Sequence, residues 1–377
     1  MKKIALLGST GSVGTQTLDV IRRYPDRLSV WALVAKDGID MVREQIREFS
    51  PQLVGLVDKE EARKLSKEVR IPVLAGEEVA ELVAKENGYD TLVSATVGLT
   101  GIRAALAAIR NGKQLALANK ETLVAAGEIV MAEARKYNAR ILPIDSEHSA
   151  LLQCLNGENP RMIRQLVITC SGGALRDKTK QELENVSIED ALGHKTWNMG
   201  RKITVDSATL MNKGFEVLEA MWLYGVKPEQ IRVVIHPQSI VHSMIEYSDG
   251  SILAQMSDPD MRLPIQYALS YPDRWDAPVR RYDPVSRDLT FGEPDLDRFP
   301  CLGYAFRSMS LLGTLPAVMN AANDYMVGRF LDGKCRYLDI PKVIGRVMDA
   351  HTLIEHPTLE DIEQAIGWAT EYAKSES

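Results

Sequence analysis

The sequence lacks the features of several protein classes. Its four cysteines (Cys154, Cys170, Cys301 and Cys335) include no C-x-x-C pair, which argues against a zinc ribbon or a disulfide framework and fits a reducing compartment. No apolar run approaches the ~20 residues of a membrane span, and the first run ends at Gly8, too early for a secretion signal. The net charge is −6, so no nucleic-acid partner is expected. We therefore expect a cytoplasmic protein that binds neither membranes nor nucleic acid.

What the chain does have is the composition of a globular protein of two or three domains. It holds 377 residues, 45% of them hydrophobic, and a domain takes roughly 150 residues. Short apolar runs alternate with helical patterns up to residue 137, which is typical of a parallel sheet covered by helices. We predict an α/β protein with an N-terminal Rossmann-like doubly wound sheet, a central α+β catalytic domain with an open sheet, and a C-terminal helical domain. The predicted segments are 1–145, 146–270, a linker over 271–300, and 301–377.

A glycine-rich turn near the N-terminus predicts a nucleotide site. A buried strand over 4–7 leads into Gly8-Ser9-Thr10-Gly11-Ser12-Val13-Gly14, and a helical pattern begins at Thr15. This context is typical of dinucleotide binding, because glycines let the backbone approach a pyrophosphate at the helix N-terminus. A plain tight turn is the alternative. Lys36, at the end of a strand predicted over 28–35, suits a 2′-phosphate and favours NADPH over NADH, unless it is only a solvated loop charge.

Two carboxylates follow a predicted strand at the end of the first domain. Residues 141–144 are apolar and lead into Asp145-Ser146-Glu147. On an extended backbone the i, i+2 spacing points both acids to one side. Unpaired acids beside a core are costly, whereas a hard divalent cation prefers oxygen ligands. The pair is therefore a candidate metal site, and the alternative is that Asp145 caps the next helix while Glu147 is solvated.

Small residues after a strand predicted over 166–170 suggest an anion site. Ser171-Gly172-Gly173 could present backbone N–H groups to a phosphate, or it could be a simple turn. Cys170 could be a nucleophile, as in an acylating semialdehyde dehydrogenase, although such a cysteine is more often an inert core residue. The polar loop 193–202 carries Trp197, which suggests a lid that closes over a ligand. A Trp197 that plugs the core is the competing interpretation.

A helix is predicted after Leu210, preceded by a short strand over 202–205. Asn212 and Glu216 are four residues apart, and Lys213 and Glu216 are three apart, so these side chains share one face. They could form an ordinary surface ion pair. Alternatively, Asn212 and Lys213 bind a phosphate while Glu216 supplies a third metal ligand.

The remaining chain predicts an open sheet followed by helices. Strands are predicted over 232–235, 239–247 and 251–256, with a turn at Asp249-Gly250. The outer edge of such a sheet suits homodimer formation. About four helices follow residue 301, divided at Pro316, Gly333, Pro341 and Pro357.

Taken in order, these motifs resemble one family. Together with Asn119-Lys120-Glu121, Val205-Asp206-Ser207-Ala208-Thr209 and Ile235-His236-Pro237-Gln238-Ser239, they are similar to the 1-deoxy-D-xylulose 5-phosphate reductoisomerase family over essentially the whole chain. The resemblance implies an enzyme that uses NADPH and a divalent metal ion (Mg²⁺, Mn²⁺ or Co²⁺). Its substrate would be the sugar phosphate 1-deoxy-D-xylulose 5-phosphate, and its product 2-C-methyl-D-erythritol 4-phosphate, an isoprenoid precursor of the non-mevalonate route. The resemblance also implies a homodimer.

The resemblance implies a role for each matching residue. The NADPH contacts would be Thr10, Gly11, Ser12, Val13, Asn119, Glu121 and Gly200, to which we add Lys36. The sugar phosphate would contact Lys120, Ser146, Glu147, Ser171, His194, Ser207, Asn212, Lys213 and Glu216. Asp145, Glu147 and Glu216 would bind the metal, and with Lys120 they would form the catalytic set. The chain departs from the family at Lys36-Asp37-Gly38, where Gly-Lys-Asn is common.

We hypothesise that a metal ion acts as Lewis acid and template while a carbon–carbon bond breaks and re-forms, before hydride transfer from the nicotinamide. Lys120 would steady the developing charge, and phosphate binding would favour closure of the lid. Two other hypotheses compete with this one. The first is a metal-free semialdehyde dehydrogenase that uses Cys170, and the second is a non-catalytic protein that senses NADPH.

Overall fold

The computed structural model describes every residue of the chain except Val97, Asn198 and Arg287. Asn198 belongs to the predicted lid over 193–202, and Arg287 belongs to the predicted linker over 271–300. For these two residues the predictions lie outside the part of the chain that the structure describes.

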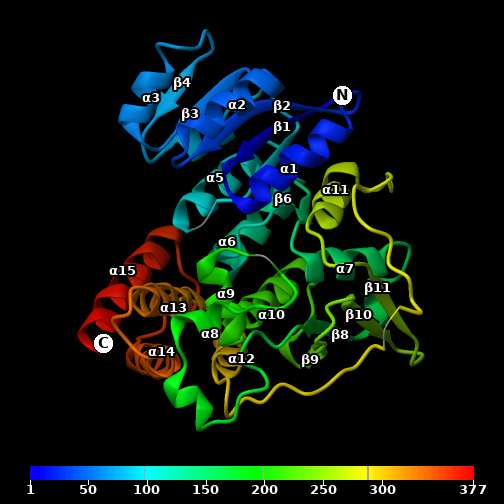
Figure 1. Ribbon diagram of the computed structural model, residues 1–377, viewed down its shortest axis with the longest axis vertical. Helices are drawn as coiled ribbons and strands as arrows, with labels where there is room; N and C mark the ends of the chain where they lie inside the picture. Colours follow the sequence, from blue (N-terminus) through cyan, green and yellow to red (C-terminus); the bar gives the residue numbers. More distant parts are fainter. Residues whose placement is uncertain (97, 198, 287) are drawn as a thin grey trace. The chain divides into compact units, whose positions relative to one another are not determined.

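The chain folds into two compact units, each assembled from separate stretches (Figure 1). Unit 1 contains Met1–Thr122, Glu128–Ser149 and Asp260–Arg280, and unit 2 contains Leu123–Gly127, Ala150–Pro259 and Arg281–Ser377. This division differs from the four continuous segments predicted from the sequence, and those segments stay a prediction.

Unit 1 contains a seven-stranded parallel sheet, as predicted. Its strand order is β4-β3-β2-β1-β5-β6-β7, so the chain runs outward from β1 in one direction and then, from β5, in the other. In open α/β sheets, ligands bind at the carboxyl ends of the strands where the order switches. The strands are β1 (Lys2–Leu7), β2 (Leu28–Ala35), β3 (Leu53–Leu56), β4 (Val73–Ala75), β5 (Thr91–Ser94), β6 (Gln114–Leu117) and β7 (Ile141–Pro143).

Helices follow the strands of this sheet, and one further helix joins them from far along the chain. That helix, α11 (Arg262–Ser270), contacts α1 (Ser12–Arg23). Lys2 Nζ donates to the Leu269 carbonyl at 2.7 Å, which fastens α11 to the start of β1. The other helices that follow these strands are α2 (Ile39–Phe49), α3 (Lys59–Leu65), α4 (Val79–Ala84), α5 (Leu99–Arg110), α6 (Glu121–Lys136) and α7 (Ser146–Leu155). Leu123–Gly127 of α6 and the part of α7 from Ala150 onward belong to unit 2.

Unit 2 contains the predicted open sheet. Its order is β11-β10-β8-β9, with β10 antiparallel to both neighbours and β8 parallel to β9. Strand β11 therefore lies at an edge. The strands are β8 (Ile163–Cys170), β9 (Ile231–Ile235), β10 (Val241–Tyr247) and β11 (Ile252–Met256), and short 3₁₀ turns are η1 (Pro160–Met162), η2 (Glu182–Asn185) and η3 (Pro228–Gln230).

Four helices end the chain, as the sequence predicts. The second of them, α13, is buried along most of its length, because it contacts its neighbours on several sides. Such a helix is apolar nearly all round rather than along one stripe. The four are α12 (Cys301–Leu311), α13 (Leu315–Leu331), α14 (Asp339–Ala350) and α15 (Leu359–Ser375). No helix formed by the described residues is long and apolar enough to cross a membrane.

The strand predicted over 202–205 is wrong. These residues belong to a helix, α9 (Arg201–Ala208), which follows α8 (Ile188–Leu192) and precedes α10 (Met211–Tyr224). The β-branched run Ile203-Thr204-Val205 favours a strand. Burial decides the outcome, because Val205 is fully buried in the core of unit 2, and tertiary packing overrides weak local propensity.

Candidate active site

The glycine-rich turn of unit 1 has a backbone that only small residues allow. Gly8 has φ +80°, and a Cβ there would lie 2.5 Å from the Ala95 carbonyl oxygen. A Cβ on Gly14 would lie 2.1 Å from the Gly8 carbonyl oxygen. Gly11 is the N-cap of α1 and offers no side-chain cap. The turn therefore stands at the switch between β1 and β5 with the start of α1 open to an anion.

The loop after β2 lies beside this turn. Thr10 Oγ1 donates to the Asp37 carbonyl at 3.3 Å, and a Cβ on Gly38 would lie 3.5 Å from Thr10 Cγ2. Lys36 is exposed at the start of this loop. The Lys36-Asp37-Gly38 sequence therefore borders the predicted dinucleotide turn even though it departs from the common family pattern.

Asn119 is fixed after β6 by several hydrogen bonds. Its Oδ1 accepts from the Thr122 N–H at 3.1 Å, and its Nδ2 donates to the Thr96 carbonyl at 2.9 Å and to Glu121 Oε2 at 2.7 Å. A Cβ on Gly101 would lie 2.6 Å from Asn119 Oδ1. Asn119 and Glu121 thus follow the carboxyl end of β6, and each orients the other.

Asp145 caps α7. Its Oδ1 accepts from the Glu147 N–H at 3.1 Å, so the extended backbone predicted for Asp145 and Glu147 is wrong. The predicted cap by Asp145 is confirmed, whereas Glu147 is half-buried rather than solvated. The reason for the cap is that Ser146 already begins a helix, whose first N–H groups need acceptors. Lys120 forms an ion pair with Asp145 Oδ2, and Ser146 Oγ donates to Glu147 Oε2. The result is a partly buried acidic pair beside the Lys120 ammonium group, and this pair offers oxygen ligands.

Unit 2 contains a buried carboxylate, Glu216, on α10. Asn212 Nδ2 donates to Glu216 Oε1 at 2.6 Å, and Lys213 Nζ forms an ion pair with Glu216 Oε2. The side chains of Lys213 and Glu216 are only 4% and 2% exposed. The predicted shared face is confirmed, and the alternative of an ordinary surface pair is excluded. A buried acid of this kind is costly unless it is paired and used.

The turn after β8 is built around Ser171 and His194. His194 Nε2 lies 2.9 Å from Ser171 Oγ. His194 Nδ1 accepts from the backbone N–H groups of Thr196 at 3.3 Å and Trp197 at 3.0 Å. Burial lowers the pKa of His194, and the nearby charge of Arg176 lowers it further. The neutral ring therefore carries its proton on Nε2 and donates to Ser171.

The Ser171 hydroxyl oxygen already accepts two hydrogen bonds. Its Oγ accepts from the Gly173 N–H at 3.2 Å as well as from His194. A hydroxyl has two lone pairs and one proton, so the proton of Ser171 points to a third group. Gly173 has φ +73°, and a Cβ there would lie 2.4 Å from the Ser207 carbonyl oxygen. The turn thus packs directly against α9, which carries Ser207.

Within unit 2, Trp197 of the predicted lid over 193–202 packs against His242 of β10. Its ring centroid lies 6.1 Å from that of His242, at an interplanar angle of 59°, and its side chain is half-buried. Gly200 is the N-cap of α9, and its carbonyl accepts from the Thr204 N–H at 3.1 Å. The movement of this loop as a lid stays a prediction.

The structure also contains a polar cluster that sequence reasoning missed. Asp206 is buried and accepts from Asn323 Nδ2 at 2.8 Å, while Lys202 Nζ lies 2.9 Å from Asp206 Oδ2 and 2.7 Å from Asp324 Oδ1. The cluster joins α9 to α13. The i, i+4 spacing of Lys202 and Asp206 would predict their ion pair on a helix. The prediction of a strand over 202–205 excluded that interpretation.

Cys170 does not resemble a catalytic nucleophile. It is buried in the apolar core cluster of unit 2 at the end of β8. A reactive thiolate needs an exposed, electropositive site. This position argues against the semialdehyde dehydrogenase hypothesis.

Comparisons with known proteins identify the family of the chain. Family models described as 1-deoxy-D-xylulose 5-phosphate reductoisomerase and its C-terminal domains match residues 4–127, 141–224 and 256–372. A relative of that name from Heliobacterium modesticaldum is 50% identical, over 99% of this chain and 97% of its own. Another, from Shouchella clausii, is 47% identical over 96% of this chain and 97% of its own.

Solved structures match over the same extent. The Zymomonas mobilis reductoisomerase in complex with NADPH has a TM-score of 0.93 and 38% identity, covering 99% of this chain and 98% of its own. A reductoisomerase in complex with NADPH, fosmidomycin and magnesium has a TM-score of 0.95 and 37% identity, covering 100% and 98%. With near-complete coverage at up to 50% identity, the chain belongs to the 1-deoxy-D-xylulose 5-phosphate reductoisomerase family.

Proposed function

We propose how this chain performs the reaction of its family, the NADPH-dependent conversion of 1-deoxy-D-xylulose 5-phosphate to 2-C-methyl-D-erythritol 4-phosphate. The observation that carries the activity is the 50% identity over 99% of the chain to a reductoisomerase. Solved relatives bound to NADPH and magnesium support the same pair of cofactors here. The residue roles below are our proposal, and they rest on the geometry of each unit.

NADPH is proposed to bind along the switch point of the seven-stranded sheet. Thr10, Gly11, Ser12 and Val13 would meet the pyrophosphate, because the glycine backbone leaves room that a Cβ would fill. Lys36 would pair with the 2′-phosphate, and its loop already contacts Thr10. The contacts nearer the nicotinamide are assigned to Asn119, Glu121 and Gly200. NADPH bound in this way supplies the hydride for the reduction.

The metal ligands are proposed to be Asp145, Glu147 and Glu216. Three carboxylates form a hard oxygen donor set of the kind that Mg²⁺ and Mn²⁺ prefer, which fits the residues present. A divalent ion held there supplies Lewis-acid chemistry to the substrate oxygens. Lys120, paired with Asp145, would stabilise negative charge that develops on the substrate as the carbon skeleton rearranges.

The phosphate of the substrate is proposed to bind in unit 2. The Ser171 hydroxyl can donate its remaining proton to an anion, because its oxygen already accepts from His194 and Gly173. Binding energy at this remote group helps to orient the reacting carbons. The other residues assigned to the substrate are Ser146, Glu147, Ser207, Asn212, Lys213 and Glu216.

The test is the loss of NADPH absorbance when 1-deoxy-D-xylulose 5-phosphate is added, with and without a chelator. Glu216→Gln should lower kcat by more than about 100-fold, since a ligand contributes at least as much as its supporting shell. The Kd for NADPH should not change. Glu371→Gln, on the exposed side of α15, is the matched control. If the Glu216→Gln enzyme remains fully active after its metal has been removed, Glu216 is not a metal ligand.

We propose in addition that the enzyme is a cytoplasmic homodimer that pairs through β11. This edge strand exposes Ile252, Leu253 and Met256 to 55%, 40% and 39%, and an apolar edge is a template for another strand. All four cysteines are free thiols, as expected in a reducing compartment. Light scattering should give twice the chain mass of 41.9 kDa, and Leu253→Lys should shift the protein to monomer. A monomeric parent protein would contradict the proposal.

A further inference from the structure

The extended segment that precedes α12 is fastened to the sheet of unit 2 next to the Ser171 turn. Ile235 and Gly292 exchange backbone hydrogen bonds of 2.8 and 2.9 Å. His236 Nδ1 lies 2.9 Å from the Thr290 carbonyl oxygen, and the His236 ring stacks on Phe291 at 4.6 Å. We refer to residues 290–298 as the strap. These contacts tie the strap to the end of β9, although none of its residues, all of which the structure describes, belongs to a helix or a long strand.

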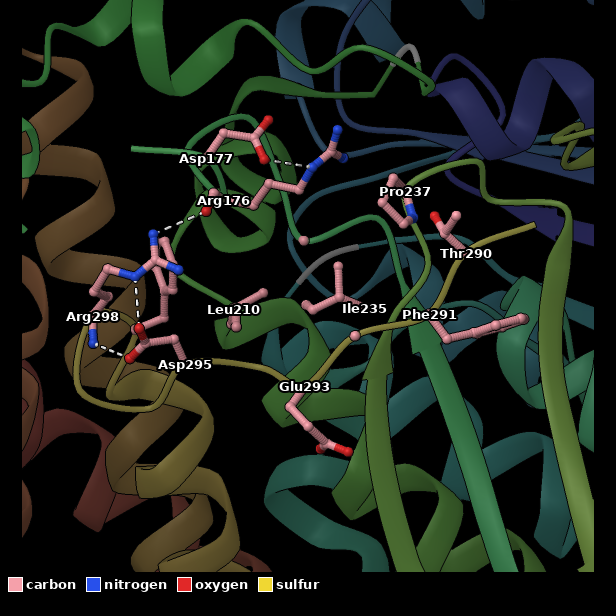
Figure 2. A pocket seen from close by; sticks show the side chains of 13 residues that line it. Arg176, Asp177, Leu210, Ile235, Pro237, Thr290, Phe291, Glu293, Asp295 and Arg298 are labelled. Carbon is pink, nitrogen blue, oxygen red and sulfur yellow. Dashed lines mark hydrogen bonds and ion pairs between the residues drawn. The ribbon is translucent and has the colours of Figure 1, made fainter. Parts of the chain in front are cut away.

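The strap ends in an arginine that holds the chain beyond the Ser171 turn. Arg298 Nη1 donates to the carbonyl oxygens of Arg176 at 3.0 Å and Lys178 at 2.6 Å. Its Nε donates to Asp295 Oδ2 at 2.8 Å, and Asp295 Oδ1 accepts from the Arg298 N–H at 3.0 Å. Figure 2 shows Arg298 reaching both Asp295 and the Arg176 backbone. Asp295 of the strap therefore orients Arg298 toward the carbonyl groups of Arg176 and Lys178.

Arg176, whose backbone is held by Arg298, also contacts the Ser171 turn. Its Nη1 donates to the Ser171 carbonyl at 2.7 Å. Its stem packs under the turn, because a Cβ on Gly172 would lie 3.0 Å from both Cβ and Cδ of Arg176. The guanidinium also lies 3.3 Å from the Asp177 carboxylate, as drawn in Figure 2. One arginine thus contacts the turn at Ser171 and at Gly172, and its own backbone is held by Arg298.

We propose that Arg176 and Arg298 are positioning residues for the sugar phosphate, acting through the Ser171 turn and touching no substrate atom themselves. This inference rests on the proposed phosphate-binding role of Ser171 and His194. Gly172 and Gly173 both have positive φ, and a two-glycine turn has a large conformational entropy when nothing holds it. The two arginines remove that freedom before the substrate arrives, and preorganisation of this kind raises affinity.

Two variants test the positioning role of Arg176 and Arg298. Arg298→Gln removes the bonds to two carbonyls, and Arg176→Gln removes the bond to Ser171. Each should raise the KM for 1-deoxy-D-xylulose 5-phosphate by about ten-fold or more, the size of one hydrogen bond to a charged group, with kcat and the KM for NADPH changed much less. Arg176 is 22% exposed beside a cavity of about 260 Å³, so its replacement leaves a site that water can reach.

The matched control is Arg232→Gln. Arg232 also contacts the strap, through an ion pair with Glu293, but it is 52% exposed and lies on β9 rather than on the turn. The KM for the sugar phosphate should stay within about two-fold, because exposed pairs contribute little. Equal KM increases in Arg232→Gln and Arg298→Gln would show that any lost contact of the strap has this effect, and would overturn the positioning role of Arg176 and Arg298.

A second readout separates positioning from simple loss of stability. Removing the charge of Arg176 should raise the pKa of His194, measured by NMR of histidine-labelled enzyme, whereas Arg298→Gln and Arg232→Gln should not. Ser171→Ala tests the underlying assignment. If Ser171→Ala raises the KM whereas Arg176→Gln and Arg298→Gln do not, the positioning role fails while the proposed phosphate site stands. If Ser171→Ala leaves the KM unchanged, the proposed phosphate site fails first.

Discussion

His194 and Ser171 form a pair whose hydrogen-bond direction is fixed. The Nε2 to Oγ distance is 2.9 Å, and both backbone donors at Nδ1 require that nitrogen to be unprotonated. The ring must therefore be a neutral donor toward Ser171. This direction leaves the serine proton for a ligand, so the pair can recognise an anion without carrying a formal charge.

The first prediction concerns this pair. His194→Ala should raise the KM for the sugar phosphate by about 10- to 100-fold, because the serine loses the donor that orients its proton. The Kd for NADPH, measured by fluorescence titration, should stay the same. His356→Ala, at an exposed position on the loop before α15, is the control. Unchanged steady-state kinetics in His194→Ala would remove His194 from the substrate site.

The second prediction concerns pH and stability. Burial lowers the pKa of His194, His236 and His351 below the ordinary value in each case. The unfolded chain, with a histidine pKa of about 6.5, therefore binds more protons than the native chain does at mildly acidic pH. The stability from the neutral rings is fully present above about pH 6.5 and is lost as the pH falls through the native pKa values. Urea midpoints should drop accordingly.

A single variant tests whether a buried histidine causes this loss of stability at acidic pH. His351 Nε2 forms a hydrogen bond with Thr314 Oγ1 at 2.7 Å. His351 lies far in sequence from the residues assigned to the substrate. His351→Gln keeps a polar group there but cannot titrate. The decline of the urea midpoint between about pH 7 and pH 5 should become shallower. A decline as steep as that of the parent enzyme would mean that His351 does not contribute.

How much the sequence could predict depended on how far apart the interacting residues lie. The contact of Asn212 with Glu216 follows from helical spacing, and the turn at Gly8 follows from its place after a strand. The capping role of Asp145 was foreseen only as an alternative, since the spacing of two acids cannot tell a strand end from a helix start. The bonds from Arg298 to Arg176 span 122 residues. No local pattern carries such a contact, because it depends on the path of the strap.

The third prediction separates two glycines of one turn. Gly14→Ala should destabilise the protein by about 1–3 kcal/mol, the usual cost of overpacking, because its Cβ would lie 2.1 Å from the Gly8 carbonyl oxygen. Gly11 has φ −77°, and its Cβ would lie at 3.4 Å from the same oxygen. Gly11→Ala should therefore cost less than about 1 kcal/mol, as a weaker N-cap. Urea unfolding of both variants measures the difference, and equal losses would contradict the steric argument.

The fourth prediction concerns the buried acid that joins α9 to α13. Asp206 accepts from Asn323 at 2.8 Å and pairs with Lys202 at 2.9 Å. Asn323→Ala removes one donor from a buried carboxylate, which should cost about 1–3 kcal/mol of unfolding free energy. Asp324→Asn removes only a half-exposed partner of Lys202 and should cost less than about 1 kcal/mol. Chemical denaturation of the two variants compares these losses. If Asp324→Asn proves as damaging as Asn323→Ala, the stabilisation comes from the lysine and its two acids rather than from the amide that satisfies Asp206.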